Sequence, residues 1–456
     1  MMFRSRAARR RSSLMAVSAI ACSVALALAG CSSGTGSSSA GSATSGTVKW
    51  WGWSPQIEAS KSYIAEFNKV YPNIKVIYKQ FPTATYDAAL RPALASSDGP
   101  DVFDVAPGGG IGSVNLYSND EVDLTPVVKK ALGSSWKSKL APIGVTGLTT
   151  AGKLGGLPIG STYAGSLWIN PNYFQKYHLT PPKTLTEWVK DCAVFKSHGA
   201  TCFEQGAADT GFDQDTLQAI SDSVAPGLWT KAEKGQAQWT NPSFVTAFTI
   251  WKNMFSDGIM QPGALGVQQE PDVNNSFLGG QSAMVMMGTW FMQYATAPGN
   301  TAAVQGSGVT GAKSFPVIAI PFPDVAGKGN PSTMFGDADY GLAVNAKSSV
   351  KGAAETFASW LTTSKEGQQT IANALNDIPS LNGLQPKWNT IKLVDSSTQQ
   401  SNLQTLISDS GKSSEPRLSL VSASLGQAIG VAATTVAAGS ATPAKALQTL
   451  QSTVGK

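Results

Sequence analysis

Short apolar runs alternate with amphipathic stretches after position 46, and this alternation constrains the fold more than any other feature of the chain. Three strands are predicted at 47–53, 74–78 and 101–106. Residues 57–70 carry apolar side chains at helical spacing, and a second helix is predicted around 86–96. A strand–helix–strand–helix–strand order favours a parallel sheet covered by helices, so we expect an α/β lobe here.

The first 30 residues have the features of a secretory signal rather than of a folded domain. Five arginines precede an apolar run at 14–29, and the sequence LAGC occupies 28–31. Small residues before a cysteine are typical of a lipoprotein signal, so we predict a signal peptide at 1–30 and a lipid on Cys31. An ordinary signal with a coincidental cysteine is the alternative, and Sec and twin-arginine export are both open. The Ser/Gly-rich residues 31–46 would then tether the domain to the outer face of the cell membrane.

The positive charge of the chain belongs to that signal. The whole chain has 34 Lys and Arg residues against 29 Asp and Glu residues. The five arginines of the signal account for the entire difference, so the mature chain is neutral. It also lacks the basic stripe that is typical of nucleic-acid binding, and we therefore expect no nucleic-acid partner.

Two cysteines remain in the mature domain, Cys192 and Cys202. An even pair in an oxidising compartment predicts a disulfide bond. The pair and the nearby His198 lack a fourth ligand at the usual spacing, so we expect no metal site. About 410 residues follow the tether, which exceeds a usual single core and favours two domains.

Motifs for catalysis and cofactors fail on inspection. GKS at 411–413 lacks the leading glycine of a phosphate-binding loop, and GGGIG at 108–112 misses the spacing of a dinucleotide-binding loop. The sequence has no G-x-S-x-G motif, and His178 and His198 both stand in polar contexts. We therefore expect no cofactor and no enzymatic activity. Three aspartate pairs still leave a glycoside-acting enzyme open: Asp101 with Asp104, Asp213 with Asp215, and Asp337 with Asp339.

The stretch WWGWSP joins the first predicted strand to the first predicted helix. Trp50 is predicted to be a core residue, whereas Trp51 fits either the core or the surface. Trp53 lies past the glycine at the carboxyl end of the strand, where ligands bind in open α/β sheets. Ser54 is predicted to cap the helix, with Pro55 in its first turn.

Tryptophans gather at loop-like positions, namely Trp51, Trp53, Trp229 and Trp290. Sugars present apolar C–H faces and a rim of hydroxyl groups, so a sugar site combines aromatic faces with carboxylates and amides. We expect Asp104 and Asp337 to accept hydrogen bonds from ligand hydroxyls. This combination favours a carbohydrate ligand.

Several segments, in one consistent order between residues 50 and 369, resemble a known family. They are WWGW, FNKVYPNIKVIYKQFP, LRPALASSDGPDVFDVAPGG, GKLGGLPIGSTYAGSLWINPNYFQKYHLTPPKTLTEW, FLGGQSAMVMMGTW and ADYGLAVNAKSS. With them the chain resembles the extracellular solute-binding proteins of ABC importers, family 1, and within these the carbohydrate-binding, maltose-type group. Any one fragment is weakly diagnostic, and their order is strongly so.

The resemblance implies an α/β, two-lobe, periplasmic-binding-protein-like fold (type II, Venus flytrap) with multiple inter-lobe crossings. Lobe 1 is expected at 47–160 with 340–385, and lobe 2 at 161–336 with 386–456. Chain crossings between the lobes are expected near Gly160–Tyr163, near Gly336–Asp339 and around 385.

The resemblance also implies a set of ligand-binding residues: Trp53, Ser54, Tyr86, Asp104, Ala106, Pro107, Tyr163, Trp229, Trp290, Asp337 and Arg417. It implies a monomeric, lipid-anchored receptor that captures a sugar or oligosaccharide and delivers it to the transmembrane subunits of an ABC permease. A secreted glycoside-acting enzyme is the alternative from another class. A polyol, a glycerol-phosphate ester or a peptide are alternative ligands.

Overall fold

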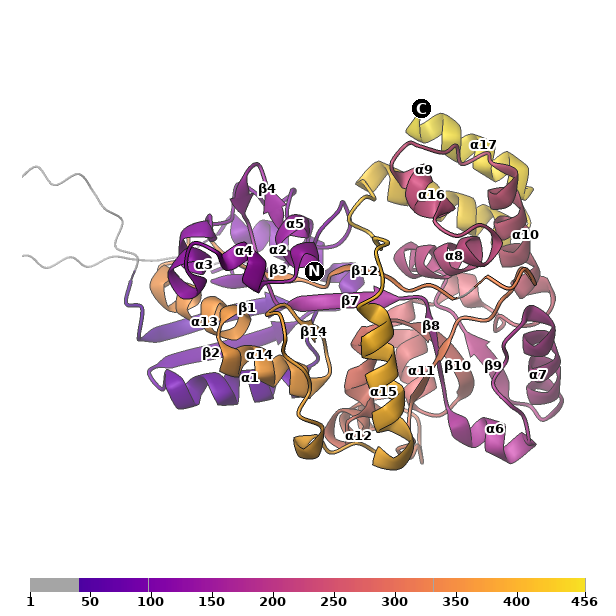
Figure 1. Ribbon diagram of the computed structural model, residues 1–456, viewed down its shortest axis with the longest axis horizontal. Helices are drawn as coiled ribbons and strands as arrows, with labels where there is room; N and C mark the ends of the chain where they lie inside the picture. Colours follow the sequence, from indigo (N-terminus) through magenta and orange to yellow (C-terminus); the bar gives the residue numbers. More distant parts are fainter. Residues whose placement is uncertain (1–40, 97, 331, 456) are drawn as a thin grey trace, which may run out of the picture. The chain divides into compact units, whose positions relative to one another are not determined.

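The computed structural model describes residues 41–96, 98–330 and 332–455 (Figure 1). These residues belong to one compact unit. The predicted signal peptide, the lipid on Cys31 and most of the predicted tether lie outside the described residues and stay predictions.

The first lobe is built on the predicted parallel strands. β1 (Gly46–Gly52) lies between β2 (Ile74–Gln80) and β3 (Val102–Val105) and pairs with both in parallel. Strands from later in the chain extend this sheet, because β13 (Gly341–Val344) pairs antiparallel with β3 and with β6 (Leu157–Pro158). The strand order is β2-β1-β3-β13-β6, so the carboxyl ends of three parallel strands share one edge.

Two separate parts of the chain supply the helices of this lobe. They are α1 (Ile57–Val70), η1 (Thr83–Thr85), α2 (Tyr86–Leu94), α3 (Thr125–Leu132), α4 (Trp136–Lys139), α5 (Pro142–Gly147), α13 (Lys351–Thr363) and α14 (Lys365–Ala374), with a small hairpin of β4 (Thr149–Thr150) and β5 (Lys153–Leu154). Their apolar faces bury one core in which the Phe357 ring lies 5.5 Å from Trp50 and 5.1 Å from Phe67, centroid to centroid. Residues 351–374 therefore belong to the first lobe although they follow most of the second lobe in sequence.

A second sheet organises the second lobe. Its strand order is β11 (Ile318–Pro321), β8 (Ser166–Ile169), β10 (Ser282–Met287) and β9 (Thr201–Glu204). All residues of the central strand β10 are buried, as expected for a strand with neighbours and helices on every side.

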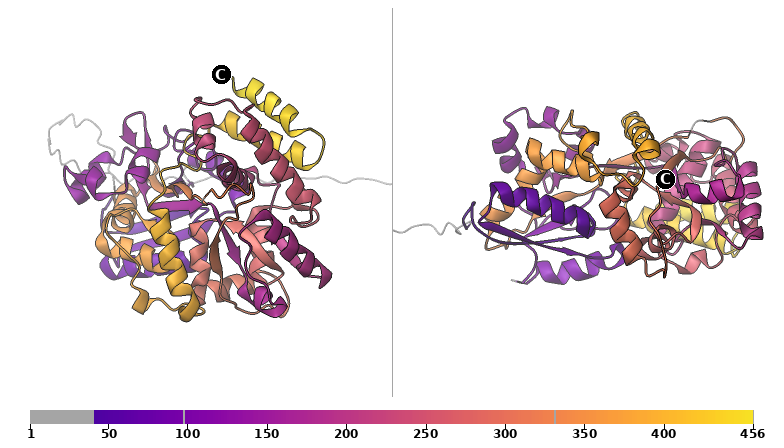
Figure 2. Two further views of the ribbon diagram at one scale, coloured as in Figure 1. Left: turned by 45° about the vertical axis from the view of Figure 1, so that its right-hand side comes forward. Right: turned by 90° about the horizontal axis from the view of Figure 1, so that it is seen from below.

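The second lobe is richer in helices than the first. They are α6 (Pro171–Tyr177), α7 (Leu185–Ser197), α8 (Thr210–Val224), α9 (Leu228–Glu233), α10 (Pro242–Ser256), η2 (Ala264–Gly266), η3 (Gln269–Val273), α11 (Asn274–Leu278), η4 (Thr289–Ala295), α12 (Ala297–Gly306), η5 (Trp388–Thr390), α15 (Ser396–Ser410), α16 (Ala423–Ala437) and α17 (Pro443–Val454). Helices α8, α10 and α16 pack against one another, and α17 lies along α16 (Figure 2). No helix in the described part of the chain combines the length and apolarity needed to cross a membrane.

Three short strands connect the lobes. In their sheet, β7 (Gly160–Ala164) pairs antiparallel with both β12 (Phe335–Ala338) and β14 (Ile378–Pro379). The first two strands coincide with the crossings expected at 160–163 and 336–339. Near the third expected crossing, around 385, Leu381 still packs against the first-lobe core and Asn382 donates to the Lys139 carbonyl, whereas Trp388 packs in a core of the second lobe.

Two local expectations are wrong. Ser54 does not cap the first helix, since α1 begins at Ile57 and Gln56 occupies the cap position without a side-chain hydrogen bond. The reason is that the Ser54 amide N–H donates to the Asp104 carboxylate at 3.4 Å, which holds Ser54 at the strand end. The predicted tether also ends early, because the Ala43 carbonyl accepts a hydrogen bond from the Thr356 hydroxyl at 2.8 Å and Gly46 already belongs to β1.

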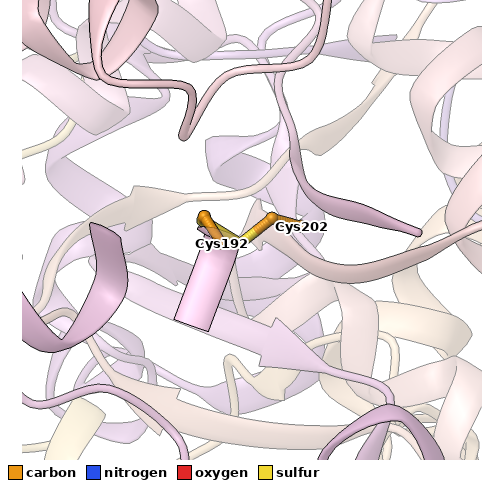
Figure 3. The surroundings of a disulfide bond; sticks show 2 residues. All are labelled: Cys192 and Cys202. Atoms are coloured by element: carbon orange, nitrogen blue, oxygen red, sulfur yellow. A yellow bond between two sulfur atoms is a disulfide. The ribbon is translucent and has the colours of Figure 1, made fainter. Parts of the chain in front are cut away.

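Cys192 and Cys202 form the predicted disulfide bond, with an S–S distance of 2.00 Å (Figure 3). Cys192 lies in α7 and Cys202 in β9, which is the last strand of its sheet. The bond therefore ties a surface helix to an edge strand of the second lobe.

Candidate functional site

A cavity of about 640 Å³ lies between the lobes, at the carboxyl end of β1. We call it the inner compartment. The first lobe contributes Trp53, Ser54, Gln56, Thr83, Ala84 and residues 109–111, and the second lobe and its connections contribute residues 208–212, Gln214, Gln268, Glu270, Trp290, Gln293, Asp339, Arg417, Leu418, residues 421–423, Gly426 and Gln427. Its volume falls within the range of about 300–1,000 Å³ typical of small-molecule sites.

Trp53 lines the inner compartment, and its ring packs closely against Gly112. Its indole ring packs edge-to-face against Tyr86 and Tyr340, at centroid distances of 5.0 and 6.1 Å. A Cβ atom on Gly112 would lie 2.5 Å from this ring, so only glycine fits there. By contrast Trp50 is fully buried, and Trp51 is partly exposed and packs against Phe81.

Trp290 lines the inner compartment from the second lobe, and its ring packs closely against Gly288. A Cβ atom on Gly288 would lie 1.9 Å from the Trp290 ring. The Arg417 guanidinium lies over the Trp290 ring, with its Cζ 4.5 Å from the ring centroid, and donates two hydrogen bonds of 2.7 Å to Asp215. Arg417 thus holds the indole in place while its own charge is offset by a buried carboxylate.

Asp337 positions Arg417 without lining the inner compartment. It lies in the connecting strand β12 and is buried. Its carboxylate accepts hydrogen bonds from the backbone N–H groups of Arg417, Leu418 and Ser419. A lobe-connecting strand therefore fixes the start of the loop that carries the arginine.

Loop 108–112 of the first lobe and loop 418–423 of the second lobe meet at the inner compartment. The Gly109 amide N–H donates to the Val421 carbonyl at 2.9 Å. A Cβ atom on Gly109 would lie 2.3 Å from the backbone nitrogen of Ala423, whereas a Cβ atom on Gly110 would meet no atom within 4 Å. The glycines of GGGIG therefore permit backbone-to-backbone contact between lobes.

Three carboxyl groups give the inner compartment its electrostatic character. Burial, reinforced by the charges of Asp209 and Asp339, raises the pKa of Glu270 to about 7. Burial also raises the pKa of Asp209 and the pKa of Asp339. Arg417 is the only Lys or Arg that lines this compartment in the described part of the chain, and it is paired with Asp215. The compartment therefore offers hydrogen-bond acceptors and disfavours an anionic ligand.

The structure places four of the residues predicted from the family resemblance at this cavity: Trp53, Ser54, Trp290 and Arg417. The other predicted residues do not line the cavity. Tyr86 is buried and its hydroxyl donates to the Asp104 carbonyl at 2.8 Å, while the Asp104 carboxylate accepts from Trp50 Nε1 at 2.8 Å. These two residues support the strand end that carries Trp53.

The remaining predicted residues do not line the inner compartment. Ala106 and Pro107 are buried, and Tyr163 covers Gly336 on the connecting strands. Trp229 is 1% exposed in the core of the second lobe, where its Nε1 donates to Glu233 and its ring packs on Trp239 at 5.1 Å. Trp229 lies in α9, and its side chain is buried in the core. Its loop-like sequence context gave no indication of this orientation.

Several cavity-lining residues were not predicted: Gln56, Thr83, Asp209, Glu270, Gln293 and Asp339. Asp339 stands in a carboxylate pair that the sequence displays. Gln56 is held by a 3.1 Å hydrogen bond from Gln80, a contact across 24 residues, and Glu270 is brought in from a segment with no recognisable motif. These residues come from segments far apart in the sequence, and only the folded structure brings them to one cavity.

The described residues contain no group of His, Cys, Asp and Glu side chains that could hold a metal ion. The aspartates of the pairs noted in the sequence have hydrogen-bond partners within the protein. Asp101 accepts from the Lys49 amide and the Ser348 hydroxyl, and Asp213 accepts from the Gln205 amide. Asp337 of the third pair accepts from the 417–419 backbone, so at least one carboxylate of each pair is hydrogen-bonded within the protein.

Comparison with known proteins agrees with this architecture. An uncharacterised ABC transporter extracellular-binding protein of Pyrococcus horikoshii is 22% identical over 276 residues, 56% of this chain and 60% of the relative, so the chain spans about three fifths of that curated relative. A solved structure from work on xylan utilisation by Caldanaerobius polysaccharolyticus has a TM-score of 0.69 at 22% identity, covering 90% of this chain and 100% of the other. Maltose-bound MalE3 of T. maritima has a TM-score of 0.66 at 17% identity, covering 89% and 98%.

These structural neighbours share the two-lobe α/β fold and thereby support the predicted fold class. The family model described as bacterial extracellular solute-binding protein matches residues 53–368, most of the described chain. That match begins at Trp53, on the wall of the inner compartment, and runs through both lobes and two of the three connecting strands. The chain belongs to the bacterial extracellular solute-binding proteins.

Proposed function

We propose that this protein is the sugar receptor of an ABC importer, and that it captures a neutral carbohydrate in the inner compartment. The observation that carries the proposal is the pairing of two indole faces, Trp53 and Trp290, from opposite lobes. Carboxylates and amides line the same compartment, including Asp209, Glu270 and Gln293. Aromatic faces bind the apolar C–H surface of a sugar, and the polar groups bind its hydroxyls.

The charges at the site support a neutral ligand over an acidic one. A phosphate ester or a uronic acid would meet Glu270 and Asp339 without a free cation in the described lining to offset them. Several structural neighbours were solved with, or named for, uncharged saccharides, among them maltose, maltotriose and stachyose. Chitin oligosaccharide is the named ligand of another.

Binding is a closure equilibrium rather than a reaction. A ligand that contacts both lobes stabilises the arrangement in which the lobes meet, and this arrangement would be presented to the transmembrane subunits of the permease. The receptor would work as a monomer, attached to the outer face of the membrane through the lipid on Cys31. No bond in the ligand is made or broken.

Intrinsic tryptophan fluorescence and thermal unfolding against a panel of saccharides test the proposal. A ligand at 100 times its Kd is expected to stabilise the protein by about 2.7 kcal/mol. A polyol, glycerol 3-phosphate and a peptide library serve as comparison ligands. The carbohydrate assignment fails if these shift the signals while no saccharide does. An enzyme would instead release new reducing ends from the bound saccharide during prolonged incubation.

A further inference from the structure

Two aspartates from different connecting strands meet beside the inner compartment. Asp339 directly follows β12 and Asp377 directly precedes β14, the two strands that flank β7 (Figure 1). Both approach Gly160 of β7: the Asp339 amide N–H donates to its carbonyl at 3.1 Å, and a Cβ atom on Gly160 would lie 2.6 Å from the Asp377 Cβ atom. Glycine at this position therefore leaves room for Asp377, whose carboxyl group forms a side-chain hydrogen bond with that of Asp339.

The pair holds one proton. Asp377 is 2% exposed, and its Oδ2 accepts a hydrogen bond from Asn376 Nδ2 at 2.6 Å. In the described part of the chain, no N–H group and no hydroxyl group donates to its Oδ1. A hydrogen bond between two carboxyl groups needs a proton on one of them, because two carboxylates are acceptors only and repel each other.

The surroundings place that proton on Asp377. Burial, reinforced by the charge of Asp339, raises the pKa of Asp377 well above its ordinary value. Burial also raises the pKa of Asp339, but the hydrogen bond from Asp377 and the charge of Arg417 oppose that rise. The other titratable groups that face the pair are carboxyl and phenol groups: Asp104, Glu270, Tyr63 and Tyr340. Asp339 is therefore the ionised member of the pair, and Asp377 is the protonated donor.

Only the ionised member reaches the ligand site. Asp339 lines the inner compartment, whereas Asp377 does not. Any effect of Asp377 on the ligand must therefore act through Asp339.

We propose that Asp377 is a positioning residue of the ligand site. Its protonated carboxyl group donates a hydrogen bond to Asp339 and thereby holds the Asp339 carboxylate in the inner compartment as an acceptor for ligand hydroxyl groups. Loss of this proton at higher pH sets two negative charges against each other across β7, so Asp339 is displaced and ligand affinity falls. The inference rests on the proposed sugar-binding function and adds a proton dependence that an uncharged ligand does not itself carry.

Two substitutions of Asp377 separate its hydrogen bond from its ionisation. Asp377→Asn keeps the shape of the side chain, since the new Nδ2 can donate to Asp339 while the new Oδ1 accepts from Asn376, and it does not titrate. Asp377→Ala removes the donor. Asp257→Asn is the matched control, because Asp257 is an exposed aspartate at the end of α10. Maltotriose, xylotriose and chitotriose are the probes, titrated by calorimetry into each protein at pH 6 and pH 9.

The wild-type protein and Asp257→Asn are expected to bind the responding probe at pH 6 and to lose affinity about five-fold or more at pH 9. Asp377→Asn is expected to bind within about three-fold of the wild-type protein at pH 6 and to lose less affinity at pH 9, because its donor does not dissociate. Asp377→Ala is expected to bind about ten-fold more weakly at pH 6, because a hydrogen bond to a carboxylate is lost. Glu270 is present in all four proteins, so its own titration cancels in the comparison.

Melting temperatures of the unliganded proteins test the shared proton separately. A proton held more tightly by the folded protein than by the unfolded chain contributes stability that is full below the ordinary aspartate pKa, near 3.8, and is lost as the pH rises through the raised value. The melting temperature of the wild-type protein is therefore expected to fall further between pH 6 and pH 9 than that of Asp377→Asn.

Equal affinities of Asp377→Ala and Asp377→Asn at pH 6 overturn the inference and leave the sugar receptor intact. A fall in affinity or in melting temperature at pH 9 that is as large in Asp377→Asn as in the wild-type protein does the same. If Asp377→Ala does not fold, the pH profile of Asp377→Asn decides alone. If none of the probes binds the wild-type protein, the proposed function itself fails, and the inference fails with it.

Discussion

Replacing Gly109 with alanine isolates the contact between the two lobes from the rest of the site. The added Cβ atom would lie 2.3 Å from the backbone nitrogen of Ala423, far inside van der Waals contact, and both partners are backbone atoms that cannot rotate away. Loops 108–112 and 418–423 must therefore separate. Gly109→Ala also breaks the 2.9 Å hydrogen bond from its N–H to the Val421 carbonyl.

The size of the effect follows from these two losses. One hydrogen bond contributes about 0.5–1.5 kcal/mol, and steric separation of the loops adds to it. If the lobe-contact arrangement is disfavoured by about 1.4 kcal/mol, ligand affinity falls about ten-fold. The lobe cores are untouched, so the melting temperature of the unliganded protein is expected to fall by no more than about 2–4 °C.

Gly110→Ala is the matched control, because a Cβ atom there meets no atom within 4 Å. Calorimetric titration of both variants with a saccharide that binds the wild-type protein gives the comparison. We expect about ten-fold weaker binding for Gly109→Ala and unchanged binding for Gly110→Ala. Equal affinities for Gly109→Ala and the wild-type protein would refute the reasoning, and so would equal losses in the two variants.

Further predictions concern single side chains. Trp53→Ala is expected to weaken saccharide binding at least ten-fold with little change in melting temperature, whereas Trp50→Ala is expected to destabilise the fold by about 3–5 kcal/mol, measured by urea unfolding, because it empties a core position. The pKa of Glu270 is about 7 in the folded protein, above its usual value near 4.5, so the folded protein holds this proton more tightly than the unfolded chain does. The stability that Glu270 contributes is therefore full below about pH 4.5 and is lost as the pH rises through 7. Glu270→Gln is expected to reduce this decline in melting temperature between pH 5 and 8, and an identical pH profile would contradict the assignment. Replacing Cys192 and Cys202 with serine is expected to lower the free energy of unfolding by about 2–3 kcal/mol without changing affinity, and a loss of binding would place the bond in the site instead.

Local sequence predicted much of the fold because helical and strand periodicity is a local property. The first three strands, helix α1 and the crossings in β7 and β12 lie within a few residues of their expected positions. The start of α1 was wrong for a non-local reason, since the carboxylate that holds Ser54 comes from Asp104, fifty residues away.

The candidate site was harder to predict, because a motif reports which residue type is present but not which way it faces. Trp53 and Trp290 each come shortly after a strand and a glycine; both were predicted to bind the ligand, and both line the inner compartment. Trp229 has the same residue type and a similar loop-like context, yet it faces the core. Glu270 carries no local signal in the sequence, and only the packing of a distant segment brings it to the inner compartment.

The hydrogen bonds from the 417–419 backbone to Asp337 have a consequence for experiment. Asp337 belongs to a strand that links the lobes, and Arg417 Nε lies 2.7 Å from Asp215 and close to Trp290. A rotation of that strand must therefore alter the field and ring current at one guanidinium nitrogen. The Arg417 Nε resonance in a ¹⁵N-labelled sample is a reporter of lobe movement that needs no attached probe.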